Sequence, residues 1–417
     1  MTAEIIAVGT ELLLGDTVNT NASFLGQELA KLGVSVFMHT TVGDNAERLK
    51  KAYGEAFERG ADLVIATGGL GPTEDDITKE VAADFLGIPL VLHEESWELI
   101  QDLFAKFRPG IAITENNRKQ ALLPEPKDGV ILKNDNGTAP GALFERDGKR
   151  IVVLPGPPSE LRPMFLKEVM PILQKLSDRV LVSKVLKVAG IGESLLEERI
   201  KHIIDAQTNP TIAPYAKVSE VHLRLTAEAG TQTEAAGLIE PVAERLREII
   251  GTGIFGEDDE TLESAVAAAL EAKGFDLVCA ESCTGGMLVS RLIDHAGISA
   301  VLREGIVAYS NESKVARLGV DAGLIQKFGA VSPEVATAMA IGAARISPKT
   351  VGISTTGIAG PGGGTADKPV GLVYIGLAIP NREVEVKKLI ITGNRAKVRV
   401  RTTVEALNFL RLRLIEK

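Results

Sequence analysis

Short apolar runs alternate with amphipathic stretches over the first part of the chain. Each run is long enough for a buried strand, and each stretch places apolar residues three or four positions apart. The segments, in order, are residues 5–8, 22–32, 34–42, 48–59 and 63–67. Such alternation predicts βαβ units around a mostly parallel sheet. Asp147-Gly148, between two further apolar runs, predicts a tight hairpin and therefore an antiparallel edge.

The pattern changes near Val180 and changes back near residue 255. In between, strands and helices that suit a small α+β unit are predicted for residues 180–189, 193–204, 221–226 and 234–250. Residues 251–260, rich in glycine and acids, are predicted to be a linker. We expect an α/β fold class, with two α/β domains joined by the small α+β unit and boundaries at 1–172, 173–254 and 255–417.

The alternation of strands and helices returns in the last region. Strands are predicted at 277–280, 305–309, 351–354, 372–379 and 384–391, and helices from Gly285, from Pro333 and from Arg395 to about Leu414. Ser332-Pro333 is a typical helix start, with a hydroxyl cap and proline at the first helical position.

Composition narrows the class of protein. The 417 residues exceed what one core usually organises, and 45% hydrophobic with 24% charged residues is ordinary globular composition. The formal charge of −9 argues against nucleic acid as a partner. Cys279 and Cys283 are too few for a disulfide framework or a zinc site. Without a signal-peptide pattern or an apolar run long enough for a membrane, we expect a cytoplasmic protein with no membrane partner.

Ser282 lies where an apolar strand passes into a predicted helix. It is followed by four residues that we expect to contact substrate: Cys283, Thr284, Gly285 and Gly286. Backbone N–H groups at a helix start are unpaired and can stabilise an oxyanion or bind a phosphate. A capped turn without chemistry is the more common explanation of such a motif when it stands alone.

A serine nucleophile needs a base, and Lys314 follows the next predicted strand. A strand ending at Tyr309 would bring both side chains to the carboxyl edge of the sheet, where α/β proteins bind ligands. His295 lies at a predicted helix end and does not suit the role. A desolvated lysine can take the proton of a serine, although a single lysine is more often a surface residue.

A third candidate segment, residues 355–364, is rich in glycine and directly follows an apolar strand. Its backbone donors suit a phosphate or a ribose, but it is not a P-loop because the Gly-Lys-Ser/Thr ending is missing. A flexible connection is the alternative. Arg395 and Arg399, four residues apart, could clamp a phosphate or be exposed helix residues. The predicted substrate contacts of this region are Thr356, Gly357, Gly360, Arg395 and Arg399.

Two turns near the N-terminus combine glycine with carboxylates. We expect nucleotide binding there by Gly9, Thr10, Gly68, Gly69, Gly71 and Thr73. A glycine-rich turn beside acids suits a phosphate and the divalent ion that neutralises it. Asp75 and Asp76 could equally be first-turn acids that favour the helix dipole and need no ligand.

Three blocks, 280–286, 309–314 and 356–361, resemble the signature blocks of the CinA C-terminal family, the nicotinamide-nucleotide amidases. That resemblance implies hydrolysis of nicotinamide mononucleotide to nicotinate mononucleotide and ammonia, with no metal or cofactor. It also implies a role for each of four residues: Ser282 as nucleophile, Lys314 as base, Tyr309 as supporting hydroxyl and Thr356 as a substrate or oxyanion contact. The arginines match the family only through residues 393–395.

The first region resembles the CinA branch of the molybdopterin-binding fold, with matching blocks at 136–141 and 154–160. The resemblance implies metal-dependent ADP-ribose pyrophosphatase activity, although no Nudix box is present. The metal candidates are Glu11, Asp44 and Asp76, and the identity of the divalent ion is open. The middle unit resembles the KH-like insert of this family. Its Gly190-Ile191-Gly192-Glu193 loop lacks basic residues, so we expect a packing or dimerisation module and a homodimer.

The leading hypothesis is a bifunctional hydrolase that recycles pyridine nucleotides and acts on nicotinamide mononucleotide and ADP-ribose. Two alternatives remain. The first region could bind a nucleotide or pterin without catalysis, or the whole chain could be a non-catalytic scaffold linked to competence or DNA damage.

Overall fold

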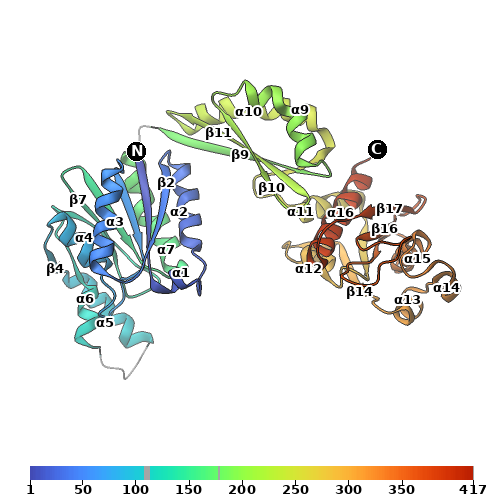
Figure 1. Cartoon of the computed structure of the whole chain (residues 1–417), viewed down its shortest axis with the longest axis horizontal. Coiled ribbons are helices and arrows are strands. Elements are labelled where there is room, and N and C mark those ends of the chain that lie inside the picture. Colours follow the sequence, from blue (N-terminus) through green and yellow to red (C-terminus); the bar gives the residue numbers. More distant parts are fainter. Residues whose placement is uncertain (108–112, 177–178, 417) are drawn as a thin grey trace. The chain divides into compact units, whose positions relative to one another are not determined.

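A computed structural model describes residues 1–107, 113–176 and 179–416 of the chain. The chain forms two compact units: unit 1 comprises Met1–Val182 with Ala227–Gly237, and unit 2 comprises Ser183–Thr226 with Leu238–Lys417 (Figure 1). In the part of the chain that the structure describes, every helix is too short or too polar to span a bilayer.

Unit 1 is built on one large twisted sheet. Its elements are β1 (Thr2–Val8), α1 (Thr10–Leu14), α2 (Thr20–Lys31), β2 (Ser35–Val42), α3 (Ala46–Glu58), β3 (Leu63–Thr67), α4 (Thr78–Leu86), β4 (Leu90–Leu92), α5 (Glu94–Phe107), α6 (Glu115–Gln120), β5 (Leu122–Pro124), β6 (Gly129–Leu132), β7 (Gly141–Arg146), β8 (Lys149–Leu154), α7 (Pro158–Met164), η1 (Phe165–Val169) and α8 (Met170–Leu176). The sheet order is β2-β1-β3-β8-β7-β6, and β4 pairs separately with β5.

The first four strands of that sheet order are parallel, and β7 and β6 form an antiparallel edge. Asp147 and Gly148 join β7 to β8 with φ of 52° and 76°, the left-handed values that a two-residue hairpin turn requires. The predicted parallel sheet and its antiparallel edge are therefore confirmed. Helices α3 and α4 lie on one face and α2 and α7 on the other (Figure 1), each against its own apolar cluster.

A smaller α+β region follows. Its elements are β9 (Val180–Ala189), α9 (Glu193–Asp205), β10 (Thr211–Ala216), β11 (Glu220–Ala229), α10 (Gln232–Ile250), η2 (Gly251–Gly253) and β12 (Ile254–Glu257). They form a four-stranded sheet in the order β10-β11-β9-β12, which we call the middle sheet. Strand β10 was not among the predicted elements.

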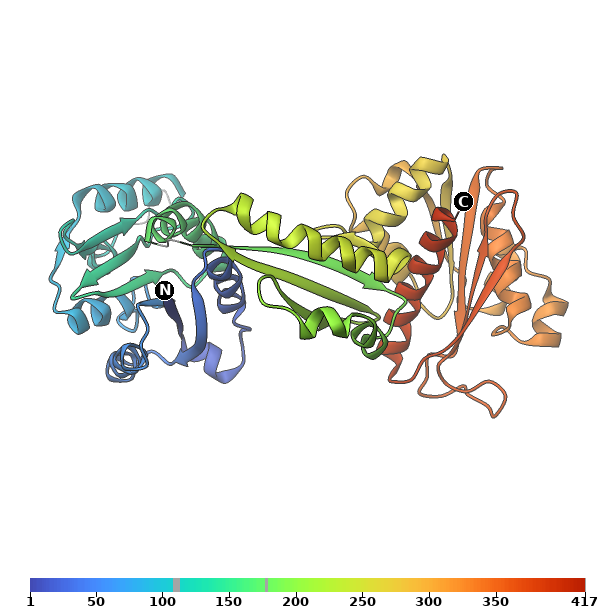
Figure 2. The same cartoon turned by 90° about the horizontal axis from the view of Figure 1, so that it is seen from above.

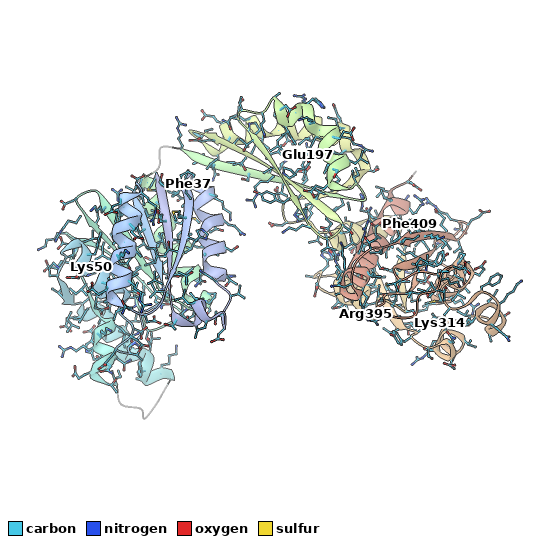
Figure 3. All side chains as sticks on the ribbon, in the orientation of Figure 1. Phe37, Lys50, Glu197, Lys314, Arg395 and Phe409 are labelled. Atoms are coloured by element: carbon cyan, nitrogen blue, oxygen red, sulfur yellow. The ribbon has the colours of Figure 1, made fainter. Side chains whose placement is uncertain are left out.

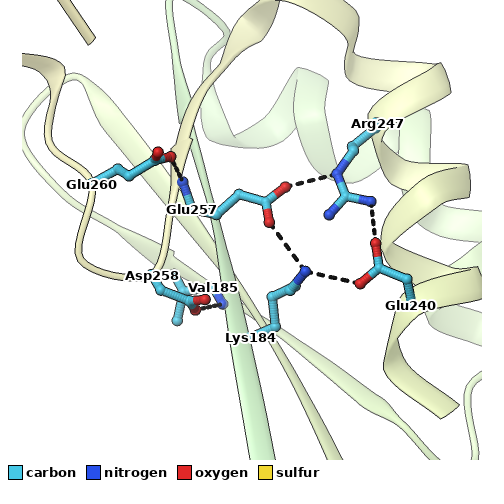
Figure 4. A network of polar contacts seen from close by, with 7 residues as sticks. All are labelled: Lys184, Val185, Glu240, Arg247, Glu257, Asp258 and Glu260. Carbon is cyan, nitrogen blue, oxygen red and sulfur yellow. Dashed lines mark hydrogen bonds and ion pairs between the residues drawn. The ribbon is translucent and has the colours of Figure 1, made fainter. Parts of the chain in front are cut away.

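The linker predicted for residues 251–260 is wrong, because Ile254–Glu257 is strand β12 and pairs antiparallel with β9. The expected boundary at 254/255 would therefore cut a strand. The acids that suggested a linker have structural partners instead. Glu257 accepts from Arg247 at 2.7 Å and lies 3.2 Å from the Lys184 ammonium (Figure 4). Glu240 of α10 closes the ring, at 2.7 Å from Arg247 and 2.8 Å from Lys184.

The C-terminal part of unit 2 holds a five-stranded sheet. Its elements are α11 (Leu262–Lys273), β13 (Asp276–Glu281), α12 (Met287–Ile293), η3 (Ile298–Ala300), β14 (Leu302–Val307), α13 (Asn311–Leu318), α14 (Ala322–Phe328), α15 (Pro333–Ala344), β15 (Thr350–Gly357), β16 (Leu372–Ala378), β17 (Glu385–Ile390) and α16 (Arg395–Ile415). The order is β14-β13-β15-β16-β17, which we call the C-terminal sheet.

Strand β13 pairs in parallel with β14 and β15. Strand β16 pairs antiparallel with β15 on one side and with β17 on the other. Figure 2 shows α16 on one face of this sheet and α15 with its neighbours on the other. The two faces bury separate apolar clusters. Because β13, β14 and β15 run the same way, the segments that follow them meet at one edge of the sheet.

Candidate active site

Ser282 follows β13 directly and stays close to the sheet. Its amide donates to the Thr355 carbonyl at 3.0 Å, which extends the pairing with β15 by one residue. The following helix, α12, begins at Met287 and not at the expected Gly285. Gly285 and Gly286 have φ of 59° and 91°, a left-handed backbone that cannot continue a helix and that glycine adopts without strain. Ser282 is therefore held in a tight turn with only 9% of its surface exposed.

Glu281, the last residue of β13, has a role that the sequence did not reveal. Its fully buried carboxylate accepts three backbone N–H groups, from Gly286 at 2.9 Å, Leu288 at 3.1 Å and Val289 at 3.0 Å. These are amides at the start of α12 that we expected to hold an oxyanion or a phosphate. They are occupied by the protein itself, so this expectation is wrong for them. The signal was an acid at the end of an apolar strand, directly before a helix start.

Lys314 lies on α13, whose start is capped by Ser310 through a 3.1 Å bond from the Ser313 amide. Its ammonium nitrogen lies 3.1 Å from Ser282 Oγ, 2.9 Å from the Ala308 carbonyl and 3.2 Å from the Tyr309 carbonyl. Only 1% of the residue is exposed. Among the described residues, no carboxylate lies within 4.0 Å of this nitrogen. The predicted pairing of Ser282 with Lys314 is therefore present.

Burial shifts the pKa of this lysine. Desolvation lowers the pKa of Lys314 below its ordinary value of 10.5, and the charge of nearby Glu312 offsets only part of that effect. In the structure this nitrogen donates to the Ser282 hydroxyl and to the two carbonyls. A neutral amine has two N–H donors and one lone pair. Loss of one proton would therefore leave a lone pair that can accept the Ser282 proton, as a general base requires.

Tyr309 and Arg395 form a second contact at the same edge (Lys314 and Arg395 are labelled in Figure 3). Strand β14 ends at Val307, two residues before the expected end, so Tyr309 lies in the connection to α13 with 63% of its surface exposed. Arg395, the first residue of α16, donates to the Tyr309 hydroxyl at 3.2 Å and to the Gly360 carbonyl at 2.9 Å. The glycine-rich segment after β15 is thus joined to the turn that holds the base.

Arg399, one turn further along α16, supports the serine turn. Its guanidinium donates to the carbonyls of Cys283 at 3.2 Å and Thr284 at 2.8 Å. The Thr284 hydroxyl is 2.7 Å from that of Thr355, which fixes the turn to β15. Burial raises the pKa of the Cys283 thiol to about 12, so this neighbour of Ser282 stays protonated near neutral pH and is a poor nucleophile.

Thr356 does not have the predicted orientation. It lies in β15 with 1% of its surface exposed, and its hydroxyl donates to the Ala330 carbonyl at 2.8 Å. The hydroxyl is therefore used to hold the segment before α15 and not turned toward a substrate. Gly357 is the last residue of β15, and Gly360 belongs to the connection that follows.

In unit 1, a cavity of about 450 Å³ lies at the carboxyl ends of β1, β3 and β8. The predicted nucleotide-binding glycines that line it are Gly9, Gly68, Gly69 and Gly71. Gly68 has φ of 95°, and a Cβ there would overlap the Val8 carbonyl, so the turn requires glycine. Thr10 and Thr73 lie beside the cavity and donate hydrogen bonds to two acids of its lining, Asp44 and Asp76. The expected convergence of the two turns is present.

The predicted metal ligands, Glu11, Asp44 and Asp76, line this cavity but do not form a metal site. Across residues 1–107, 113–176 and 179–416, no group of three or more His, Cys, Asp or Glu is placed to hold a metal ion. The Asp44 carboxylate accepts from the amide and hydroxyl of Thr10 at 2.9 and 2.8 Å. Asp76 accepts from the amide of Thr73 at 2.9 Å. The two aspartates stabilise their own turns. Asp76 is not the N-cap or a first-turn acid that the sequence also allowed, because α4 begins at Thr78 after Ile77.

One lining residue was missed. Asn21 of α2 donates through Nδ2 to the Gly156 carbonyl at 2.7 Å, while its buried Oδ1 has no hydrogen-bond partner. Since buried polar atoms are nearly always bonded, this oxygen suits a donor supplied by a ligand. In the sequence, Asn19-Thr20-Asn21 indicates only a helix start, so nothing distinguishes Asn21 as a contact.

Comparison with known proteins places all these segments in one family. Three family descriptions match in order: "Probable molybdopterin binding domain" over residues 4–175, "Damage-inducible protein CinA KH domain" over 183–256 and "CinA C-terminal domain" over 259–414. A "CinA-like protein" of Kosmotoga olearia is 52% identical over 415 residues, covering 100% of this chain and 99% of its own. The chain belongs to the CinA family.

Two further similar proteins carry related names. A "putative competence-damage inducible protein" of Clostridium novyi is 50% identical over 418 residues, covering 100% of this chain and 99% of its own. The crystal structure of the competence/damage inducible protein CihA of Agrobacterium tumefaciens is 37% identical, covers 37% of this chain and 96% of its own, and has a TM-score of 0.35. Within this family, unit 1 corresponds to the molybdopterin-binding domain. The middle sheet, with α9 and α10, corresponds to the KH domain.

Proposed function

We propose that the C-terminal sheet carries an amidase that converts nicotinamide mononucleotide to nicotinate mononucleotide and ammonia. The 3.1 Å contact between Lys314 Nζ and Ser282 Oγ carries this proposal. It supplies a hydroxyl nucleophile and a buried amine whose pKa is lowered by desolvation. The carboxamide as substrate comes from the resemblance of the three sequence blocks to the nicotinamide-nucleotide amidases.

The residues support a two-step reaction. Neutral Lys314 takes the proton of Ser282 as Oγ forms a bond to the carboxamide carbon, and the protonated lysine then donates this proton to the nitrogen as the C–N bond breaks and ammonia leaves. Water enters, gives one proton to Lys314 and attacks the acyl-serine. As the bond to Oγ breaks, Lys314 returns this proton to Oγ, and the carboxylic acid that forms releases its remaining proton to the solvent as it leaves.

The arginines at the same edge supply positive charge. Arg395 and Arg399 each donate to backbone carbonyls, and carbonyls do not neutralise a guanidinium. We propose that this charge attracts the substrate phosphate, while Tyr309, held by Arg395, contacts the substrate with its exposed ring.

Ammonia release from nicotinamide mononucleotide tests the amidase. Wild type should release ammonia, and Ser282→Ala should lose activity by about 10⁴-fold or more, because the attacking atom is gone. Cys283→Ala is the matched control. It removes the neighbouring buried thiol and should keep most activity. Full activity in Ser282→Ala, or loss only in Cys283→Ala, would refute the assignment of the nucleophile.

For unit 1 we propose that the 450 Å³ cavity binds ADP-ribose and cleaves its pyrophosphate. The unpartnered Asn21 Oδ1 is the observation that favours a ligand there, since a ribose hydroxyl can supply the missing donor. The acids do not form a metal group by themselves, so no step through a metal is assigned.

Incubation with ADP-ribose, with and without a divalent ion, separates catalysis from binding alone. Appearance of AMP and ribose phosphate supports a pyrophosphatase, and dependence on the ion tests the expected metal requirement. Binding without cleavage would favour the non-catalytic binding module. Asn21→Ala should weaken ADP-ribose binding about tenfold through loss of a buried hydrogen bond. An unchanged affinity would remove Asn21 from the proposal.

A further inference from the structure

A second recess in unit 2 lies away from Ser282. It has a volume of about 370 Å³ and is bounded by the loop before α9, by the turn between β10 and β11, and by α16. The residues that line it are Gly190, Ile191, Gly192 and Glu193, then residues 216–221, then Lys397, Arg401 and Glu405. We call it the KH cleft, because the KH-like unit forms two of its three walls.

Three cations line the KH cleft and are poorly neutralised. Lys217, in the turn between β10 and β11, and Lys397, on α16, are both exposed, and no described carboxylate lies within 4.0 Å of either ammonium. Arg401 Nε is buried without a hydrogen-bond partner, at 3.9 Å from its nearest carboxylate oxygen, on Glu405. A surface lysine alone means little, but three cations from two walls of one recess give it a positive potential.

Two of the three acids in the lining are already paired. Glu220 binds Arg291 at 3.0 Å and contacts His222 at 3.3 Å. Glu405 binds Lys387, outside the cleft, at 2.8 Å. Only Glu193, an exposed residue at the start of α9, remains as a carboxylate without a described ion pair. The lining therefore has three cations but only one acid, Glu193, without a described ion pair, and this excess of positive charge favours an anion.

The loop at the third wall adds to this preference. Helix α9 has 13 residues and begins at Glu193, with Gly192 as a cap that offers no side-chain acceptor to the first amides. Uncapped amides and the helix dipole favour negative charge at this end. Because Gly190 and Gly192 carry no side chains, an anion can approach the backbone closely.

We propose that the KH cleft binds the phosphate or diphosphate group of a nucleotide-sized anion, with Lys217 and Lys397 as its two direct contacts and Arg401 as supporting charge. The volume suits one small anion and not a polymer. An extended nucleic acid would need a longer basic surface, which a chain of net charge −9 is poorly suited to supply. This site is separate from the amidase and does not depend on it.

The helix that supplies two of these cations, Lys397 and Arg401, also contacts the proposed amidase site. On α16, Arg395 and Arg399 contact the active-site segments, whereas Lys397 and Arg401 line the cleft. Residues four apart share a helix face, so the two pairs lie on different faces. An anion in the cleft would thus lie against the helix that holds the serine turn.

Titration calorimetry of the full chain with inorganic pyrophosphate at low salt tests the proposal. Wild type should show a binding event that Lys217→Gln/Lys397→Gln weakens about tenfold or more, as loss of charge-assisted hydrogen bonds predicts. Lys388→Gln, which removes an exposed lysine of β17 outside the cleft, is the matched control and should bind like wild type. Circular dichroism of each variant verifies that it folds.

Two outcomes would overturn the inference. If the double variant binds pyrophosphate as wild type does, the cleft is not an anion site. If a single-stranded oligonucleotide binds wild type more tightly than pyrophosphate and the double variant loses that binding, the ligand is a nucleic acid and the small-anion class is wrong. Ammonia release does not enter either result, so a failed amidase proposal leaves this test intact.

Discussion

The carboxyl edges of the two large sheets differ in what their polar side chains do before any ligand arrives. At the C-terminal sheet, Ser282 and Lys314 already contact each other at 3.1 Å. At the unit 1 sheet, Asp44 and Asp76 bind the threonines of their own turns and leave a cavity of about 450 Å³. At the first edge, the two side chains that we propose for catalysis are already in contact. At the second edge, the carboxylates bind groups of their own turns, which shows that the polar residues after similar glycine-rich turns can have very different partners.

The largest effect on this contrast between the two sheet edges is expected from a substitution at Lys314. Lys314→Met should lower the rate of ammonia release about 10³-fold or more, because Ser282 loses its proton acceptor. The wild-type rate should rise with pH as Lys314 loses its proton, with a midpoint below 10.5 because burial lowers this pKa. Lys273→Met, an exposed lysine of α11, is the control and should keep both rate and profile.

The same lysine links activity to stability. Since its pKa is lower in the folded than in the unfolded chain, the unfolded chain binds more protons between the two values, so the free energy of unfolding falls as pH decreases through that window. Lys314→Met should remove this contribution. A flat wild-type rate profile from pH 6 to 10, or an unchanged profile in Lys314→Met, would contradict a lysine base.

A substitution at Glu281 tests whether the proposed Ser282–Lys314 site depends on this buried carboxylate. Glu281→Gln should lower the free energy of unfolding by about 2 kcal/mol, because a neutral amide replaces a buried carboxylate that accepts three N–H groups. Ammonia release should fall about tenfold, mainly in kcat, as the serine turn loosens. Thermal unfolding and steady-state kinetics measure both effects. Glu304→Gln, an exposed acid of β14, should change neither.

The smallest effect is expected in unit 1. Asp76→Ala should cost about 1 kcal/mol of stability, since it removes the acceptor of the Thr73 amide from an otherwise intact turn. Ammonia release should stay at the wild-type rate. Denaturant unfolding and the ADP-ribose assay provide the measurement. A variant that folds normally but loses all ADP-ribose turnover would show that Asp76 acts in chemistry, and the contrast between the two edges would weaken.

Predicting the fold from sequence succeeded where burial leaves an apolar signature. Strand β3 has the predicted bounds because it is a short, fully buried run of strand-forming residues. Strand β9 also has its predicted bounds, although Ser183, Lys184 and Lys187 interrupt its apolar residues. Strand β12 was missed because glycine and acids mark it as a linker, and only the Arg247 and Lys184 contacts of Glu257 explain that acid. Periodicity cannot report which distant cation will meet a given carboxylate.

The site was predictable to a similar degree. Ser282, Lys314 and Tyr309 were placed at one edge because strand ends of a parallel sheet converge. The sequence did not show that the Thr356 hydroxyl bonds a backbone carbonyl, or that Asp44 and Asp76 accept from the amides and hydroxyls of nearby threonines, because no motif encodes these partners. Glu281 was visible in the sequence, but its role depends on the left-handed turn at Gly285 and Gly286.

Helix α16 places a restriction on how this chain can change during evolution. Near its start, Arg395 and Arg399 bind the carbonyls of Gly360 and Cys283 beside the candidate site. Near its end, Arg411 donates to the carbonyls of Thr252 at 2.6 Å and Ile254 at 3.3 Å, which holds β12 and the residues before it. Each residue advances a helix by about 100°. A single-residue insertion between these contacts would rotate one set away from its partners, so we expect length changes among relatives to fall in surface connections such as residues 362–369 and not within this helix.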